Sequence, residues 1–246
     1  MATIDLADRR STRGMGEARW AGLLYLLYFL SALPLALRAA LIVPGDAVAT
    51  AGRILASQDV YRLTVVSDLV SYLLYIALIY LLYRLLKPVS RTWAAVGALF
   101  AFTGCIVLVA ATALVTAPLL LLADDAGTAI GLAERQALAL LTLRLFAQAY
   151  TIALFLFGAQ WVVMGPLFTA SRLVPRAIGW LLTAGGAAWI ALSLATLLDP
   201  PLGRSLQGFV LPLGALAEIA LGLWLLVKGP GPTAPGDAAF PLPHDV

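Results

Sequence analysis

The chain has few of the residues on which metalloproteins and redox enzymes depend. Its 246 residues include one cysteine and one histidine. One cysteine cannot form an internal disulfide or a thiolate cage, and His244 lies in the final residues of the chain. We therefore expect no metal site and no bound cofactor such as haem. The lysines, Lys87 and Lys228, lie at predicted helix ends, which excludes a buried Schiff-base lysine.

Charged residues are also scarce. They make up 12% of the chain, about half of the roughly 25% usual for a soluble domain, whereas hydrophobic residues make up 62%. So few charges cannot cover a water-soluble domain of this length, and the composition predicts an integral membrane protein. The formal net charge is +3, but the basic residues are dispersed beside apolar segments, so we exclude nucleic acid as a partner.

Long apolar runs, by contrast, are abundant. Six are long enough to cross about 30 Å of hydrocarbon as helices, at about residues 20–43, 61–86, 93–122, 137–168, 177–198 and 209–227. The third and fourth exceed the required length, which predicts tilted helices or helices that project beyond the bilayer. We predict an all-α polytopic membrane protein with six transmembrane helices. Residues 1–18 form an N-terminal segment, 19–228 the transmembrane domain and 229–246 a disordered tail rich in proline and glycine.

The distribution of Lys and Arg predicts the orientation, because positive residues are retained on the cytoplasmic side. Ten lie on the side of the N-terminus, namely Arg9, Arg10, Arg13, Arg19, Arg84, Lys87, Arg91, Arg172, Arg176 and Lys228. Four lie near the opposite helix ends, namely Arg53, Arg62, Arg135 and Arg204, together with six acids. Both termini are therefore predicted to be cytoplasmic.

Two features are expected near the outer end of the first span. Pro34 is expected to kink the helix. After it, Asp46 is expected to cap a short helix through about Ser57, whose apolar side is formed by Val48, Ala51, Ile54 and Leu55. This helix fits two roles, a connector packed on the helix ends or a lid over an outward-facing cavity.

Four ionisable residues lie within the predicted spans, namely Arg38, Asp68, Arg144 and Glu218. Each is expected to face the bundle interior, because a charge in hydrocarbon costs on the order of 2.5 to 3.5 kcal/mol. Counted from the predicted helix ends at about 1.5 Å per residue, all four lie roughly 7 to 15 Å below the outer surface. A common level predicts that the two acids and two arginines pair.

Polar stripes accompany these charges. The second span carries Tyr61, Thr64, Asp68, Ser71 and Tyr75 at spacings of three and four, and the fourth carries Gln148 and Thr151 after Arg144. The candidate ligand-binding residues are therefore Arg38, Asp68, Tyr75, Arg144, Gln148 and Glu218. Three interpretations remain open: a buried network that fixes helix packing, a pathway for a ligand or proton, and arginines that clasp an anion. Arg38 is also the best candidate to snorkel to the interface.

The last span has Gly214 and Gly222 four residues on either side of Glu218, which predicts close packing by a neighbouring helix. Five tryptophans lie towards the predicted inner ends, as interfacial anchors do, namely Trp20, Trp93, Trp161, Trp180 and Trp224.

Several short motifs resemble a known family. They are Val43-Pro44-Gly45-Asp46-Ala47, Ala49-Thr50-Ala51, Ile54-Leu55-Ala56-Ser57 with Arg62, Pro175-Arg176 with Ile178-Gly179, and Leu223-Trp224-Leu225-Leu226-Val227-Lys228-Gly229. Over about residues 19 to 229 the chain resembles the bacterial integral-membrane family catalogued as domain of unknown function 4386. The resemblance implies a bacterial multispanning membrane protein and implies no activity. We expect this protein to lie in the bacterial inner membrane.

The sequence therefore supports two functional hypotheses. In the first, the protein binds or transports a small amphipathic or anionic molecule through a polar cluster that opens outward. In the second, it is a structural or regulatory partner of other membrane proteins, and its buried charges only fix helix packing. An intramembrane enzyme ranks lowest and no catalytic residue is assigned, because no nucleophile with an adjacent base accompanies the carboxylates. Membrane lipid is the expected surrounding partner.

Overall fold

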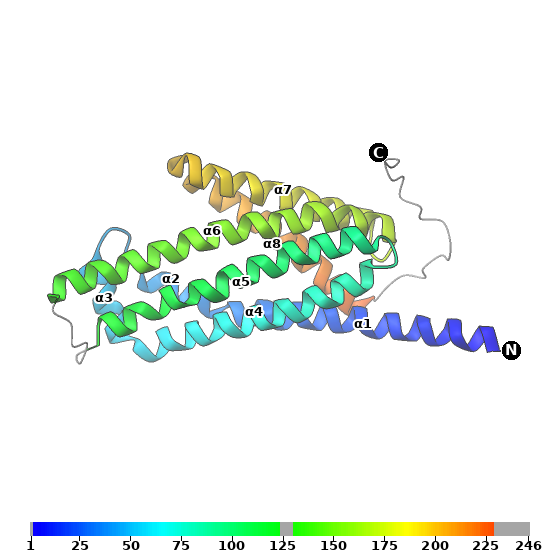
Figure 1. Ribbon diagram of the computed structural model, residues 1–246, viewed down its shortest axis with the longest axis horizontal. Coiled ribbons are helices and arrows are strands. Elements are labelled where there is room, and N and C mark those ends of the chain that lie inside the picture. Colours follow the sequence, from blue (N-terminus) through cyan, green and yellow to red (C-terminus); the bar gives the residue numbers. More distant parts are fainter. Residues whose placement is uncertain (1, 124–129, 229–246) are drawn as a thin grey trace.

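The computed structural model describes residues 2–123 and 130–228, with side chains from Gly16 onward. In these ranges every regular element is a helix (Figure 1). The helices are α1 (Ala2–Ala32), α2 (Pro34–Leu41), α3 (Ala47–Ala56), α4 (Gln58–Leu86), α5 (Arg91–Leu121), α6 (Leu132–Ser171), α7 (Arg176–Leu198) and α8 (Pro200–Val227). The predicted tail at 229–246 and the acidic turn at Asp124 and Asp125 lie outside the described residues.

The prediction of six spans is confirmed. In the described residues, six helical segments are long and apolar enough to cross a membrane, the first being α1 and α2 together from Gly16 to Leu41. All six begin earlier than predicted, and the fourth and the sixth do so by five and nine residues. The fourth starts at Leu132 because Glu134 accepts a hydrogen bond from the backbone of Gly131 in a capping arrangement. The sixth starts at Pro200 because Asp199 accepts one from the Leu202 amide at 3.3 Å.

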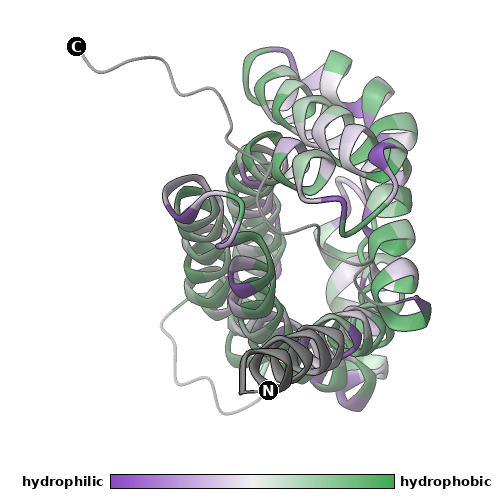
Figure 2. Ribbon diagram, turned by 90° about the vertical axis from the view of Figure 1, so that its right-hand side faces the viewer, coloured by the Kyte–Doolittle hydropathy of each residue, from purple (hydrophilic) through white to green (hydrophobic). Residues whose placement is uncertain are grey.

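The six spans form a ring. Each packs against the next along the chain, and α8 closes the ring by packing against α1 (Figure 2). Consecutive spans run in opposite directions, so the ends near residues 86, 171 and 227 lie together at the N-terminal end of the spans (Figure 1). A ring of helices surrounds the space along its axis, and the polar side chains described below lie there.

Glycines bring α6 and α7 into backbone contact. A Cβ on Gly158 would lie 2.6 Å from the carbonyl oxygen of Gly186, and one on Gly165 would lie 2.8 Å from that of Gly179. Both helices therefore place glycines seven residues apart on the same seam. Small residues let backbones approach in this way in membrane bundles, where apolar burial alone gives no preference for a neighbouring helix over lipid.

The first span breaks where Pro34 predicts. α1 ends at Ala32 and α2 begins at Pro34, because proline has no backbone N–H and its ring clashes with the preceding turn. The short helix α3 is also confirmed, since the Asp46 side chain accepts from the Ala49 amide at 2.8 Å.

The buried face of α3 differs in part from the predicted one. Ala51 and Ile54 are buried as expected, together with Thr50, but Val48 and Leu55 are exposed. The buried Thr50 hydroxyl lies 2.7 Å from the carbonyl oxygen of Asp46 and accepts from the Val43 amide at 3.0 Å, and these contacts tie α3 to the loop before it. α3 packs mainly on α6, as the connector interpretation predicts.

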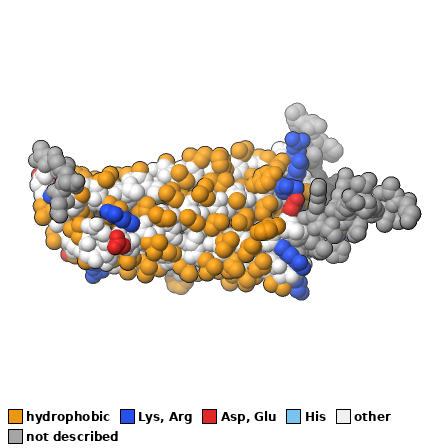
Figure 3. Space-filling model, turned by 90° about the horizontal axis from the view of Figure 1, so that it is seen from below, with side chains coloured by type: hydrophobic (Ala, Val, Ile, Leu, Met, Phe, Trp, Pro, Cys, Tyr) orange, Lys and Arg blue, Asp and Glu red, His pale blue; other side chains and the backbone are white. Residues whose placement is uncertain are grey.

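The outer surface fits a bilayer. Hydrophobic side chains cover the middle of the molecule, and the Lys and Arg side chains in view lie towards its two ends (Figure 3). Large apolar residues such as Leu73, Leu120 and Leu198 are exposed, as the lipid-facing side of a membrane bundle requires.

Candidate functional site

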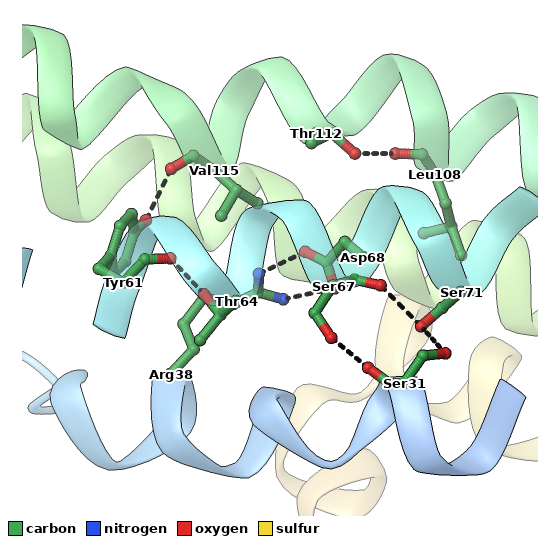
Figure 4. Close-up of polar contacts among 10 residues, drawn as sticks. All are labelled: Ser31, Arg38, Tyr61, Thr64, Ser67, Asp68, Ser71, Leu108, Thr112 and Val115. Carbon is green, nitrogen blue, oxygen red and sulfur yellow. Dashed lines mark hydrogen bonds and ion pairs between the residues drawn. The ribbon is translucent and has the colours of Figure 1, made fainter. Parts of the chain in front are cut away.

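The first buried charge is an ion pair between α2 and α4. The Arg38 guanidinium donates to both carboxylate oxygens of Asp68 (Figure 4), and the two residues are 5% and 1% exposed. The guanidinium carbon also lies 5.1 Å from the centre of the Phe146 ring on α6, within the range of a cation–π contact. Arg38 is thus held by a bidentate partner and an aromatic face, and the prediction that it snorkels is wrong.

Three serines form hydrogen bonds beside the Arg38–Asp68 pair, near the break in the first span. We call this ion pair and the serines the Asp68 centre. The Ser67 hydroxyl donates to the carbonyl of Ser31, which lies directly before the break (Figure 4). The hydroxyls of Ser31 and Ser71 are 2.7 Å apart, and Ser71 donates to the carbonyl of Ser67 at 2.8 Å. The polar stripe predicted on α4 therefore bonds to the backbone and side chain of Ser31, near the break in the first span, and it joins α1 to α4.

The second buried charge, Glu218 on α8, has a different environment. Its Oε1 accepts from the indole Nε1 of Trp161 at 2.7 Å and from the Tyr75 hydroxyl at 3.4 Å. Glu218 is 3% exposed. Within the described side chains, neither Lys nor Arg forms an ion pair with it. Two neutral donors thus hold this carboxylate.

The Tyr75 hydroxyl lies between Glu218 and the amide of Gln160, whose oxygen is 3.0 Å away. A phenol has one proton and can donate to only one of these two oxygens. With the amide turned by half a rotation, Gln160 Nε2 donates to Tyr75, and Tyr75 donates to Glu218. This orientation also gives a partner to Nε2, which otherwise lacks one. We therefore read the three residues as a chain of donors that ends on Glu218.

A cavity of about 130 Å³ lies between the two carboxylates. Asp68 and Ser71 line the end of the cavity near Arg38, and Glu218 lines its other end. Its remaining walls are mainly aromatic and apolar, formed by Tyr28, Tyr72, Tyr75, Phe146, Tyr150, Phe157, Trp189, Ala32, Leu35, Cys105, Leu108 and Leu154. A cavity of this size is close to the roughly 150 Å³ that holds a benzene ring in a protein core.

The predicted common level of the four charges is wrong. Asp68 pairs with Arg38, whereas Glu218 meets Tyr75, which follows Asp68 by seven residues on α4. At about 1.5 Å per residue, the two acids are separated by about 10 Å along that helix. The sequence count failed because α8 starts at Pro200, nine residues before the predicted start. The charges therefore form two separate centres.

Arg144 and Gln148 do not belong to the site. Both are exposed, whereas Phe146 and Tyr150 on the same helix line the cavity. Residues two apart on an α-helix point about 200° apart, so the stripe of Arg144 and Gln148 faces away from the ring interior. The prediction that both arginines pair with the buried acids therefore holds for Arg38 and fails for Arg144 among the described side chains.

The level of Arg144 explains why exposure is tolerated. Gly158 on α6 contacts Gly186 on α7, and α7 ends twelve residues later at Leu198. Counting fourteen residues back along α6 from Gly158 gives Arg144, which therefore lies about level with the end of α7. The 40-residue α6 is about 60 Å long and projects beyond the 23-residue α7. An arginine level with the end of α7, the shortest of the six spans, can extend its long side chain towards the membrane surface, where a charge costs little.

Of the six predicted site residues, the structure places Asp68, Tyr75 and Glu218 on the cavity and Arg38 beside it. Sequence analysis missed Trp161 and Gln160. Trp161 was predicted to be an interfacial anchor, but it is 1% exposed and donates to Glu218. One signal was available: Phe157, Gln160 and Trp161 follow spacings of three and four on one face of α6. The glycines beside Glu218 admit aromatic rings, since a Cβ on Gly214 would meet the Trp189 indole at 2.2 Å.

The described residues contain no group of three His, Cys, Asp or Glu side chains that could hold a metal ion.

Comparison with known proteins gives one match. A model of the family described as Domain of unknown function (DUF4386) matches residues 20–229. No curated protein and no solved structure matches the chain. The family match covers most of the 246 residues and agrees with the resemblance seen in the motifs around Pro44 and Pro175, so the chain belongs to the family described as Domain of unknown function (DUF4386).

Proposed function

We propose that this membrane protein binds a small amphipathic molecule in the cavity between its six spans. The observation that carries the proposal is the 130 Å³ cavity, which combines carboxylates at two levels with seven aromatic side chains. Ligand sites typically have mostly apolar walls and a few polar groups that fix orientation. Ionisable groups inside a membrane bundle are costly, and they often mark the pathway of a ligand or an ion.

The amphipathic form of the first hypothesis has more support than the anionic form. An anion needs a guanidinium with free donors, but Arg38 is engaged by Asp68 and Phe146. Arg144 faces away from the cavity. The carboxylates at the cavity wall would repel an anion that entered it.

The arrangement of charges supports an orientation for this binding protein. Arg84, Lys87, Arg91, Arg172, Arg176 and Lys228 lie at the ends of the spans on the N-terminal side. By the positive-inside rule, this side is cytoplasmic and the end with α3 faces outward. The proposed location is a bacterial inner membrane. Asp68 then lies on the outer side of the cavity, and Glu218 is deeper.

Ligand-detected NMR with the protein in lipid nanodiscs tests the proposal, with benzyl alcohol as a neutral amphipathic probe and empty nanodiscs as the blank. Leu108→Trp fills the cavity, since Leu108 lines it and is 3% exposed. Val109→Trp is the matched control, because Val109 is the next residue on α5 and is 44% exposed. We expect saturable binding that Leu108→Trp abolishes and Val109→Trp preserves. Binding that both variants leave unchanged would overturn the proposal.

A second candidate function has its own supporting observation. The Arg38–Asp68 pair is satisfied on both sides and joins α2 to α4, as expected of charges that only fix packing in a structural or regulatory membrane partner. In that case no probe binds in the cavity, and substitutions at both carboxylates lower stability without altering any ligand response.

A further inference from the structure

The carboxylate of Glu218 is satisfied on one oxygen only. Both hydrogen bonds, from Trp161 and from Tyr75, end on Oε1. None of the described side chains donates to Oε2, and Glu218 lines the cavity. A buried carboxylate normally has a cation or a full set of donors, because desolvation is costly otherwise. The free oxygen of Glu218 therefore provides an acceptor for a donor that enters from the cavity.

The walls beside Glu218 suit a cation. Tyr75 packs against Tyr28 with ring centres 5.0 Å apart and against Phe157 at 5.3 Å in an edge-on arrangement. Tyr150 and Trp189 also line the cavity. Aromatic faces carry negative charge density and attract ammonium groups, and cages of such rings with a nearby carboxylate are a recurring way to hold them.

The Arg38–Asp68 pair determines at which end of the cavity a cation is most stable. Asp68 is already neutralised by Arg38, so it offers little attraction to a second cation, and the guanidinium repels one. Glu218 contacts Tyr75, which lies about 10 Å from Asp68 along α4. Among the described residues, neither Lys nor Arg forms an ion pair with Glu218. A positive group in the cavity is thus most stable at the Glu218 end.

We infer that the cavity binds a small organic amine as its ammonium ion, with an N–H directed at Glu218 Oε2 and the apolar part among the aromatic rings. This inference rests on the proposed function, because it names the chemical class of the ligand for the same cavity. A metal ion fits less well, since Glu218 is a single carboxylate among aromatic walls and needs further oxygen ligands.

Three probes of similar size and different charge test the inference: benzylammonium, benzyl alcohol and benzoate, each titrated at pH 7 against the protein in nanodiscs by ligand-detected NMR. Glu218→Gln keeps the shape of the side chain and removes its charge. Glu17→Gln is the matched control for net charge, because Glu17 lies outside the cavity and pairs with Arg84 near the basic end of the molecule.

The expected order of affinity is benzylammonium, then benzyl alcohol, then benzoate. Glu218→Gln should weaken benzylammonium binding by about tenfold or more, with little change for benzyl alcohol, and Glu17→Gln should leave both unchanged. The order in the wild-type protein needs no variant, so the test stands if Glu218→Gln fails to fold.

Other results separate the two proposals. If benzyl alcohol or benzoate binds as tightly as benzylammonium, or if Glu218→Gln leaves benzylammonium binding intact, the amine inference is wrong and the cavity proposal stands. If no probe binds saturably, or if Leu108→Trp changes nothing, the proposed function fails as well. In that event Glu218 serves as a proton-binding group or a packing element.

Discussion

The two buried carboxylates of this protein differ in how their charge is balanced. Asp68 has a bidentate guanidinium partner and serine neighbours, whereas Glu218 has two neutral donors on one oxygen. Each lies on the wall of the same cavity. A charge inside a membrane bundle is therefore uninformative by itself, and its partners distinguish a packing element from a binding group.

The same difference appears in the surrounding backbone. The Asp68 centre lies at the break between α1 and α2, where the Ser67 hydroxyl donates to the carbonyl of Ser31. The Glu218 centre lies between unbroken helices α4, α6 and α8, and its donors are long aromatic side chains. The Asp68 centre therefore stabilises the backbone around the break, whereas the Glu218 centre forms part of the cavity wall.

The largest effect is expected when the paired centre loses one partner. Arg38→Met leaves the buried Asp68 without its cation, and should lower the free energy of unfolding by about 3–5 kcal/mol. Stability can be measured by titration with a denaturing detergent. The double variant Arg38→Met with Asp68→Leu should recover most of the loss, because it leaves no unpaired charge. A double variant no more stable than the single one would show that the pair itself stabilises the fold.

The Glu218 centre should respond less strongly to loss of one donor. Trp161→Phe keeps an aromatic ring and removes the 2.7 Å hydrogen bond to Glu218, which should cost about 1.5–3 kcal/mol in the same titration. Trp180→Phe is the matched control, since Trp180 is 62% exposed on the adjacent helix α7, and its effect should stay within about 0.5 kcal/mol. Equal effects of the two variants would remove Trp161 from the site.

A steric substitution on α8 tests whether Trp189 packs against this helix in the cavity wall. Gly214→Ala places a methyl group 2.2 Å from the Trp189 indole, so the ring must move, at a cost of about 1–3 kcal/mol. Gly208→Ala lies on the same helix with nothing within 4 Å of the new Cβ. This control should be neutral or slightly stabilising, because alanine favours a helix. If Gly214→Ala is equally neutral, Trp189 does not pack against α8 as described.

The smallest effect is expected at Arg144. It is exposed and lies on the face of α6 opposite Phe146, so Arg144→Gln should change the free energy of unfolding by less than about 0.5 kcal/mol. It should also leave the binding of all three probes unchanged. A loss comparable to that of Arg38→Met would return Arg144 to the charged centre and contradict its assigned orientation.

Much of the fold follows from the sequence. The six spans, the break at Pro34 and the cap at Asp46 are confirmed, because each depends on local composition or local backbone geometry. The general expectation that buried acids and arginines pair is met by Arg38 and Asp68. The sequence did not single out this pair, because it favoured snorkelling for Arg38.

The remaining features of the site depend on how far each helix extends and how it is rotated. The exposed Arg144 and the buried Trp161 were assigned to the wrong environments, because polarity alone does not give the rotation of a helix in a ring. Depths counted from predicted helix ends placed Glu218 level with Asp68, and the early start of α8 makes that count fail. The Gly214 contact with Trp189 requires knowledge of which helices are neighbours.

The attraction of cations into the cavity can be measured at Cys105, the only cysteine of the chain, which lines the cavity. Rates of its modification by cationic aminoethyl methanethiosulfonate and by anionic sulfonatoethyl methanethiosulfonate are measured relative to a free thiol. If the Glu218 carboxylate attracts cations into an open cavity, the cationic reagent reacts faster, and Glu218→Gln abolishes the preference. Equal relative rates, or no modification by either reagent, would contradict the account.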